Sequence, residues 1–159
     1  MHQTPYVHRM FRDVFTGIDT RQKKAIPINE LHTLLNEDPQ SDKLRRTQAI
    51  ANLLFLFCGM PFVDLAYLEK SNLEGNMLKY NRAKTGIPMN VEILDSAATI
   101  ISQLRNKHTT VLPEHPDYLF YILSGKNKRS DEAGYKEYQS ALRCFNNDLK
   151  SLARKLCIR

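Results

Sequence analysis

Cationic side chains lie close together in one short stretch of the sequence, at Lys79, Arg82 and Lys84, and Thr85 follows directly. Ammonium and guanidinium groups bind the oxygens of a phosphate, and a lysine can also donate a proton to a leaving oxygen. This stretch is therefore a candidate phosphate-binding site. The alternatives are a solvent-exposed lysine in a loop for Lys84 and a solvated strand face for Arg82.

A β-hairpin is the element expected to carry these residues. The pattern predicts one strand over residues 77–80, a tight turn over residues 83–86 and a second strand over residues 87–91. Lys84 should then lie at or near the tip of the turn. Because residues two apart on a strand share a face, Arg82 is expected to point the same way as Tyr80.

Helices are expected on both sides of the hairpin, because apolar residues recur there at three- and four-residue steps. They are predicted over residues 27–36, 41–57, a short segment opening at Pro61, 95–107 and 135–156. Ser41 or Asp42 can cap the second helix and Gly59 can end it. Residues 71–75 suit a turn, and the apolar residues 118–123 suit a short strand or an extended core segment. The predicted fold class is α+β, mainly helical, with a small antiparallel sheet.

The bulk composition favours a polyanionic partner. The 159 residues carry a formal net charge of +6, with a pI of about 9.3, which suits DNA, RNA or an anionic membrane surface. A basic protein without such a partner is the alternative. Residues 1–25, with Pro5, Gly17 and a basic cluster, suit a linker or arm, and residues 26–159 are the expected domain.

The cysteines and the apolar runs indicate whether the chain binds metal, forms disulfides or spans a membrane. Cys58, Cys144 and Cys157 are far apart and form no C-x-x-C pair, so no metal site is expected and reduced thiols suit a cytoplasmic protein. The longest apolar run, Leu53 to Phe57, is too short to span a bilayer. The expectation is a soluble protein with no membrane partner.

Two motifs give a resemblance to a known family. Residues 59–68 read G-M-P-F-V-D-L-A-Y-L and residues 82–86 read R-A-K-T-G. In this order they resemble the tyrosine recombinases, or phage-integrase family, in particular a bacterial mobile-element branch. The lead-in from Phe15 to Pro27 looks like that branch's connection between its two domains, and the final helix is similar too. The resemblance implies an interdomain linker over residues 1–25 and the N-terminal half of the catalytic domain over residues 26–159.

The family's chemistry assigns roles to the hairpin residues. In the family a tyrosine attacks a DNA phosphodiester, arginines and histidines hold the phosphate, and a hairpin lysine assists the leaving 5′ oxygen. Lys84 matches that lysine, so the resemblance implies a catalytic Lys84 and DNA contacts from Lys79, Arg82, Lys84 and Thr85. It further implies double-stranded DNA as partner, no cofactor, assembly of the parent protein as a multimer on DNA, and DNA integration or excision.

The sequence departs from the family where the first catalytic arginine is expected. Counted from Asp64-Leu65 that position is Pro61, and counted from the Gly-Met it is Cys58. Neither side chain replaces a guanidinium clamp. Asp64 is expected to be a structural acceptor, which in the family braces the missing arginine, or simply an acid near a helix N-terminus.

The second departure concerns the remaining catalytic groups. The chain contains no His-x-x-Arg motif, and Tyr67, Tyr118, Tyr121 and Tyr138 suit core or interface aromatics better than a nucleophile. We therefore expect a truncated catalytic domain that binds DNA and is inactive in strand cleavage. The alternative is a non-catalytic DNA-binding or protein-interaction module with the same fold. A third is an unrelated helical binding protein whose motif match is accidental.

Overall fold

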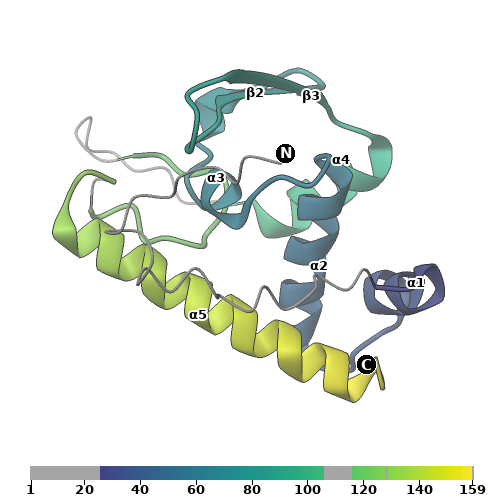
Figure 1. The fold of residues 1–159 in the computed structure, drawn as a ribbon. Coiled ribbons are helices and arrows are strands. Elements are labelled where there is room, and N and C mark those ends of the chain that lie inside the picture. The colour runs from purple at the N-terminus through teal and green to yellow at the C-terminus, as the bar shows by residue number, and fades with distance from the viewer. Residues whose placement is uncertain (1–25, 106–115, 128, 159) are drawn as a thin grey trace, which may run out of the picture.

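The computed structural model describes residues 26–105, 116–127 and 129–158. The chain is α+β and mainly helical, with one small antiparallel sheet, as expected (Figure 1). In order, the elements are α1 (Ile28–Asn36), α2 (Asp42–Leu56), α3 (Phe62–Ala66), a 3-10 helix (Lys70–Asn72), β1 (Leu73–Glu74), β2 (Met77–Asn81), β3 (Pro88–Glu92), α4 (Asp95–Leu104) and α5 (Glu132–Lys155). The predicted linker over residues 1–25 lies outside the described residues.

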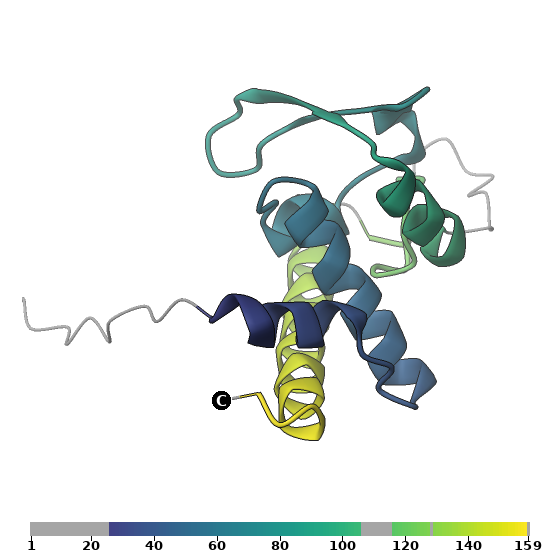
Figure 2. The ribbon, with the colours of Figure 1, turned by 90° about the vertical axis from the view of Figure 1, so that its right-hand side faces the viewer.

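Helix α2 is the central element, because α1, α4 and α5 all pack against it (Figures 1 and 2). Its buried residues Thr47, Ile50 and Leu53 recur every three positions, so one face of the helix enters the core. Ser41 occupies the N-cap position, but its side chain makes no capping hydrogen bond, so the expected cap is wrong in that respect. Helix α5 begins at Glu132, slightly earlier than predicted.

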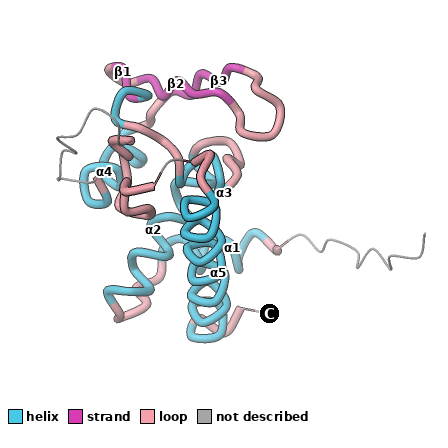
Figure 3. The backbone as a smooth tube through the Cα atoms, turned by 90° about the vertical axis from the view of Figure 1, so that its left-hand side faces the viewer, coloured by secondary structure: helices cyan, strands magenta, loops and turns pink. Residues whose placement is uncertain are grey.

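One hydrophobic core joins the helices to the sheet. Its buried members come from α2, α3, α4, two strands, the connections around α3 and the segment after Asp117: Ile50, Leu53, Phe57, Met60, Leu65, Leu68, Leu78, Tyr80, Val91, Ala97, Ile101, Leu119 and Phe120. The strands gather at one end of the molecule, and α5 runs away from them (Figure 3). The packing therefore fixes one face of the hairpin and leaves the other face to solvent.

The sheet has three strands in the order β1-β2-β3, where the sequence predicted only a hairpin. The segment predicted as a turn, residues 71–75, instead holds part of the 3-10 helix and all of β1. Asn72 stabilises this local structure, because its Oδ1 accepts the backbone N–H of Glu69 at 2.7 Å. Leu73 then pairs with Leu78 and packs against the core.

The segment from Tyr118 to Leu123 is a core segment rather than a strand, and its chain turns after Phe120. It makes two isolated bridges, Glu69 with Tyr118 and Arg105 with Phe120. Tyr118, Leu119, Phe120 and Leu123 are buried, but Tyr121 is 55% exposed. Tyr121 is thus not a core aromatic, and of the two expected roles only that of an interface aromatic remains for it.

Candidate nucleic-acid interface

The hairpin turn spans Arg82 to Ile87 and is closed by its own backbone. Arg82 N–H donates to the Ile87 carbonyl at 2.9 Å, and Gly86 N–H donates to the Arg82 carbonyl at 2.8 Å. Gly86 has φ +69°, a left-handed conformation that glycine adopts without steric cost. The glycine of the K-T-G sequence therefore allows this tight return, and the predicted hairpin is confirmed.

Lys84 and Thr85 are exposed on the turn, so the predicted position of Lys84 is confirmed. Arg82, just beyond the end of β2, is half-buried. Within the part of the chain that the structure describes, no side chain forms a hydrogen bond or an ion pair with the side chain of Lys84 or of Arg82. The turn thus presents two cations that have no carboxylate partner in the described chain.

Lys79 differs from these two residues, because it is already paired. It is exposed on β2, on the face opposite to buried Leu78 and Tyr80, and its Nζ lies 2.6 Å from Glu74 Oε2 on β1. Both side chains are about half exposed, and such pairs contribute roughly 0.2–1 kcal/mol. Lys79 can exchange this partner for a phosphate, but only by giving up its ion pair with Glu74.

Asp64 connects the turn to the helical core. It is 5% exposed on α3, and its Oδ1 accepts the backbone N–H of Ala83 at 2.8 Å, directly before Lys84. The expected role as a structural acceptor is confirmed. Its Oδ2 is buried and has no hydrogen-bond partner among the described residues. At the two positions expected for an arginine, Cys58 carries an exposed thiol and Pro61 precedes α3.

Tyr80 completes a group of neighbouring polar residues at the base of the hairpin. Burial raises the pKa of its phenol, and the negative charge of Asp64 raises it further, while the positive charge of Arg82 lowers it. The Cys58 thiol acts in the same direction as Asp64. The charge of Arg82 thus acts on the Tyr80 phenol, but Arg82 lies beyond the end of β2, so the strand face they were expected to share stays a prediction. Tyr80 was not a predicted site residue; its place two residues before Arg82 was the only sequence signal.

A second aromatic group lies between α3, α5 and the Tyr118 segment. The ring centroids of Tyr67 are 5.9 Å from Tyr118 and 5.6 Å from Tyr138. Burial raises the pKa of Tyr118 to about 12, and it raises the pKa of Tyr67 and Tyr138 as well. The ring contacts and the burial of Tyr118 suit the expected packing role.

No group of His, Cys, Asp and Glu side chains that could hold a metal ion occurs among the described residues. Cys58, Cys144 and Cys157 are all free and exposed. None of the described helices is long and apolar enough to cross a membrane.

Comparisons with protein-family models, with curated proteins and with solved structures found no match. The fold and the site define an α+β chain that carries a basic hairpin turn tethered to a helix. The resemblance to tyrosine recombinases stays a hypothesis that rests on the two sequence motifs.

Proposed function

We propose that this chain binds double-stranded DNA through the hairpin turn, as part of the catalytic domain of a tyrosine recombinase. The observation that carries the proposal is the exposed turn with Lys84 and Arg82, whose charges have no carboxylate partner in the described chain. A two-stranded ribbon fits into the major groove, and cations at its tip would neutralise phosphates and release counterions.

The tether at Asp64 supports a binding role for the turn. A loop that is ordered before binding loses less conformational entropy when its ligand arrives. The hydrogen bond from Ala83 to Asp64 fixes the backbone next to Lys84. Lys84 would then meet the DNA backbone in a defined position, where it could also protonate a leaving oxygen in a complete active site.

The residues at the first arginine position favour binding without cleavage. A phosphoryl transition state needs preorganised cations on its oxygens. Pro61 and Cys58 supply no cation. The buried Asp64 Oδ2 has no hydrogen-bond partner among the described residues, whereas in the family an arginine would bond to this carboxylate. Integration or excision of a mobile DNA element, and assembly as a multimer on DNA, are proposed for the parent protein only.

Fluorescence anisotropy with a short labelled duplex tests this function. We expect largely sequence-independent binding at low salt, with a dissociation constant on the order of 10⁻⁴ to 10⁻⁶ M. Lys84→Ala should weaken it. Lys150→Ala, which removes the same charge from an exposed lysine on α5, is the matched control and should have little effect. Absence of binding at low salt, or equal weakening in the two variants, would overturn the proposal.

A protein-interaction module with the same fold is the second candidate. Ile87 and Leu94 flank β3 and are 55% and 54% exposed, so apolar side chains are accessible at both ends of this edge strand. Leu94→Ser lies outside the hairpin turn and should leave DNA affinity unchanged if the first proposal holds. A chain that does not bind DNA, and that loses a protein partner after Leu94→Ser, would support the second candidate instead.

A further inference from the structure

The first two turns of α2 carry three cations, and two of them are neutralised. The pairs are Lys43 Nζ with Asp148 at 2.7 Å, Arg45 Nε with Asp38 at 2.9 Å and Arg45 Nη1 with Asp42 at 2.7 Å. The third cation, Arg46, forms no ion pair within the described part of the chain. It lies about 16 Å along the helix from Phe57, which marks the end of α2 nearest the hairpin.

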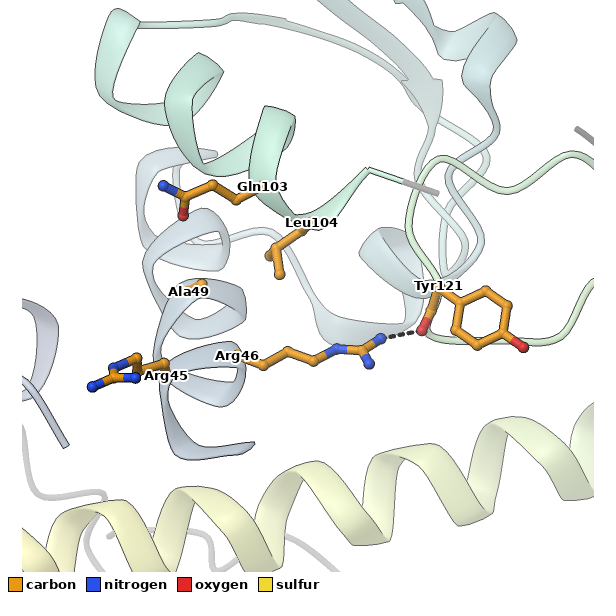
Figure 4. A pocket seen from close by; sticks show the side chains of 6 residues that line it. All are labelled: Arg45, Arg46, Ala49, Gln103, Leu104 and Tyr121. Carbon is orange, nitrogen blue, oxygen red and sulfur yellow. Dashed lines mark hydrogen bonds between the residues drawn. The ribbon is translucent and has the colours of Figure 1, made fainter. Parts of the chain in front are cut away.

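Arg46 spans the space between α2 and the segment after Asp117. Its Nη2 donates to the backbone carbonyl of Tyr121. Figure 4 shows the side chain running from α2 towards Tyr121 beneath Leu104, while Arg45 points to the opposite side of the helix. A guanidinium has five N–H donors. The others have no partner among the described residues, so they remain able to bind a ligand.

A cavity of about 320 Å³ opens beside this side chain, between α2 and α4. Its lining residues are Arg45, Arg46, Ala49, Gln103, Leu104 and Tyr121. None of these is acidic, and the carboxylates of Asp38 and Asp42 already neutralise Arg45. Arg46 is therefore the one uncompensated charge in the lining, and the apolar walls at Ala49 and Leu104 strengthen its attraction for an anion.

The neighbouring cavity shows on which side of Arg46 an anion would bind. That cavity, of about 310 Å³, shares Arg46 and Tyr121 but is also lined by Asp148. An anion there would lie beside the Asp148 carboxylate and would compete with it for Lys43, its partner at 2.7 Å. The cavity between α2 and α4 has no such group, and its volume lies at the lower end of the roughly 300–1,000 Å³ typical of small-molecule sites.

We propose that the cavity between α2 and α4 binds a phosphate group, with Arg46 as its principal ligand. A guanidinium offers parallel N–H groups that match two phosphate oxygens. The same chemistry is present in free phosphate, in a nucleotide and in the DNA backbone. Only the last of these sources rests on the proposed function.

Calorimetric titration of inorganic phosphate into the full chain tests the site. Arg46→Gln should weaken phosphate binding by about tenfold or more, because a hydrogen bond to a charged group is removed. Arg143→Gln removes the same charge from an exposed arginine on α5, outside the cavity, and should leave binding unchanged. Absence of phosphate binding, or equal weakening in both variants, would overturn the proposal.

Gln103→Glu tests the same site with a second variant, in case Arg46→Gln impairs folding. Gln103 is exposed, so the substitution should not disturb packing, but it places a negative charge at the rim. We expect a decrease in phosphate affinity comparable to that of Arg46→Gln. Unchanged affinity in Gln103→Glu would show that the anion binds elsewhere.

The hairpin variant separates this site from the proposed function. Lys84→Ala should leave binding of inorganic phosphate unchanged. If duplex DNA does not bind but phosphate still binds through Arg46, the cavity takes a free or nucleotide phosphate and the DNA proposal fails. If Arg46→Gln lowers the salt slope of DNA binding by about one, the DNA backbone is the source. If phosphate fails to bind while Lys84-dependent DNA binding persists, the cavity inference alone fails.

Discussion

The three basic residues of the hairpin differ in what surrounds each charge. Lys84 and Arg82 have no carboxylate partner in the described chain, whereas Glu74 pairs with Lys79. Sequence proximity placed all three in one group. The partner of Lys79 comes from β1, a strand that the sequence did not predict, so the distinction needed the structure.

This distinction predicts an order of effects on DNA affinity. Lys84→Ala should weaken binding more than Lys79→Ala, because phosphate must displace Glu74 from Lys79. Glu74→Gln should strengthen binding, since it frees Lys79. Anisotropy titrations at several salt concentrations would measure this, because the salt slope should fall by about one for each phosphate that a variant no longer neutralises. A larger decrease in affinity in Lys79→Ala than in Lys84→Ala would contradict the assignment.

The raised pKa of the buried Tyr118 phenol predicts that the protein loses stability in alkaline solution. Burial raises its folded pKa to about 12, from an unfolded value near 10, so the unfolded chain releases the proton first as pH rises. Stability should be constant below about pH 10 and then fall up to about pH 12, by at most roughly 1.4 kcal/mol per pH unit for this group.

Urea unfolding across that range, compared with Tyr118→Phe, isolates the contribution of this phenol. The variant should show a shallower decline, because its ring has no proton to release. The remaining decline belongs to other tyrosines whose pKa burial also raises, such as Tyr67. Identical slopes in the two chains would rule out the assigned role of Tyr118.

At the scale of elements, Asp64 determines how α3 holds the hairpin. Asp64→Ala should leave the Ala83 N–H without its acceptor and lower the free energy of unfolding by about 1–3 kcal/mol. Asp64→Asn keeps an oxygen at the same place and should cost less. Amide hydrogen exchange at Ala83 reports the bond directly, and unchanged exchange in Asp64→Ala would show that the tether is absent in solution.

Helix α2 gives a second prediction at this scale. Leu53 is fully buried in the core, so Leu53→Ala should lower the free energy of unfolding by about 2–5 kcal/mol. Phe55 lies on the same helix and is 55% exposed, so Phe55→Ala should lower the free energy of unfolding much less. Chemical denaturation of both variants measures the difference. Comparable destabilisation would mean that α2 buries a different face.

The elements that sequence reasoning found are those with a sustained local pattern. Helix α2 shows a three- and four-residue repeat, and β2 and β3 flank a turn whose glycine is identifiable from its neighbours. Strand β1 has only two residues, too few to show an alternating pattern. The bond between Asp64 and Ala83 joins residues 19 positions apart through tertiary packing, so local patterns could not predict it. The same holds for Tyr80 beside Asp64.

At the scale of the whole molecule, the two proposed sites lie towards different ends of α2. The hairpin turn contacts α3, which follows the end of α2, and the Arg46 cavity adjoins the beginning of that helix. Because the buried middle of α2 separates them, a substitution at one site should not change the structure of the other. The net charge of +6 favours polyanions at both, so only matched variants can assign binding to either site.

The whole chain should bind DNA without cutting it. Covalent cleavage needs a nucleophile and cations on the phosphate oxygens, and in the proposed family one of these cations is an arginine whose position here holds Pro61 or Cys58. Removal of a single such donor costs about 10²–10³ in rate in other enzymes. Burial raises the pKa of Tyr80 and Tyr118, which disfavours both as nucleophiles. A nicked suicide duplex should therefore yield no covalent adduct on a denaturing gel, although the same duplex binds in anisotropy. An adduct that disappears when one tyrosine of this chain is changed to phenylalanine would show that the chain completes the reaction with residues not identified from the family motifs.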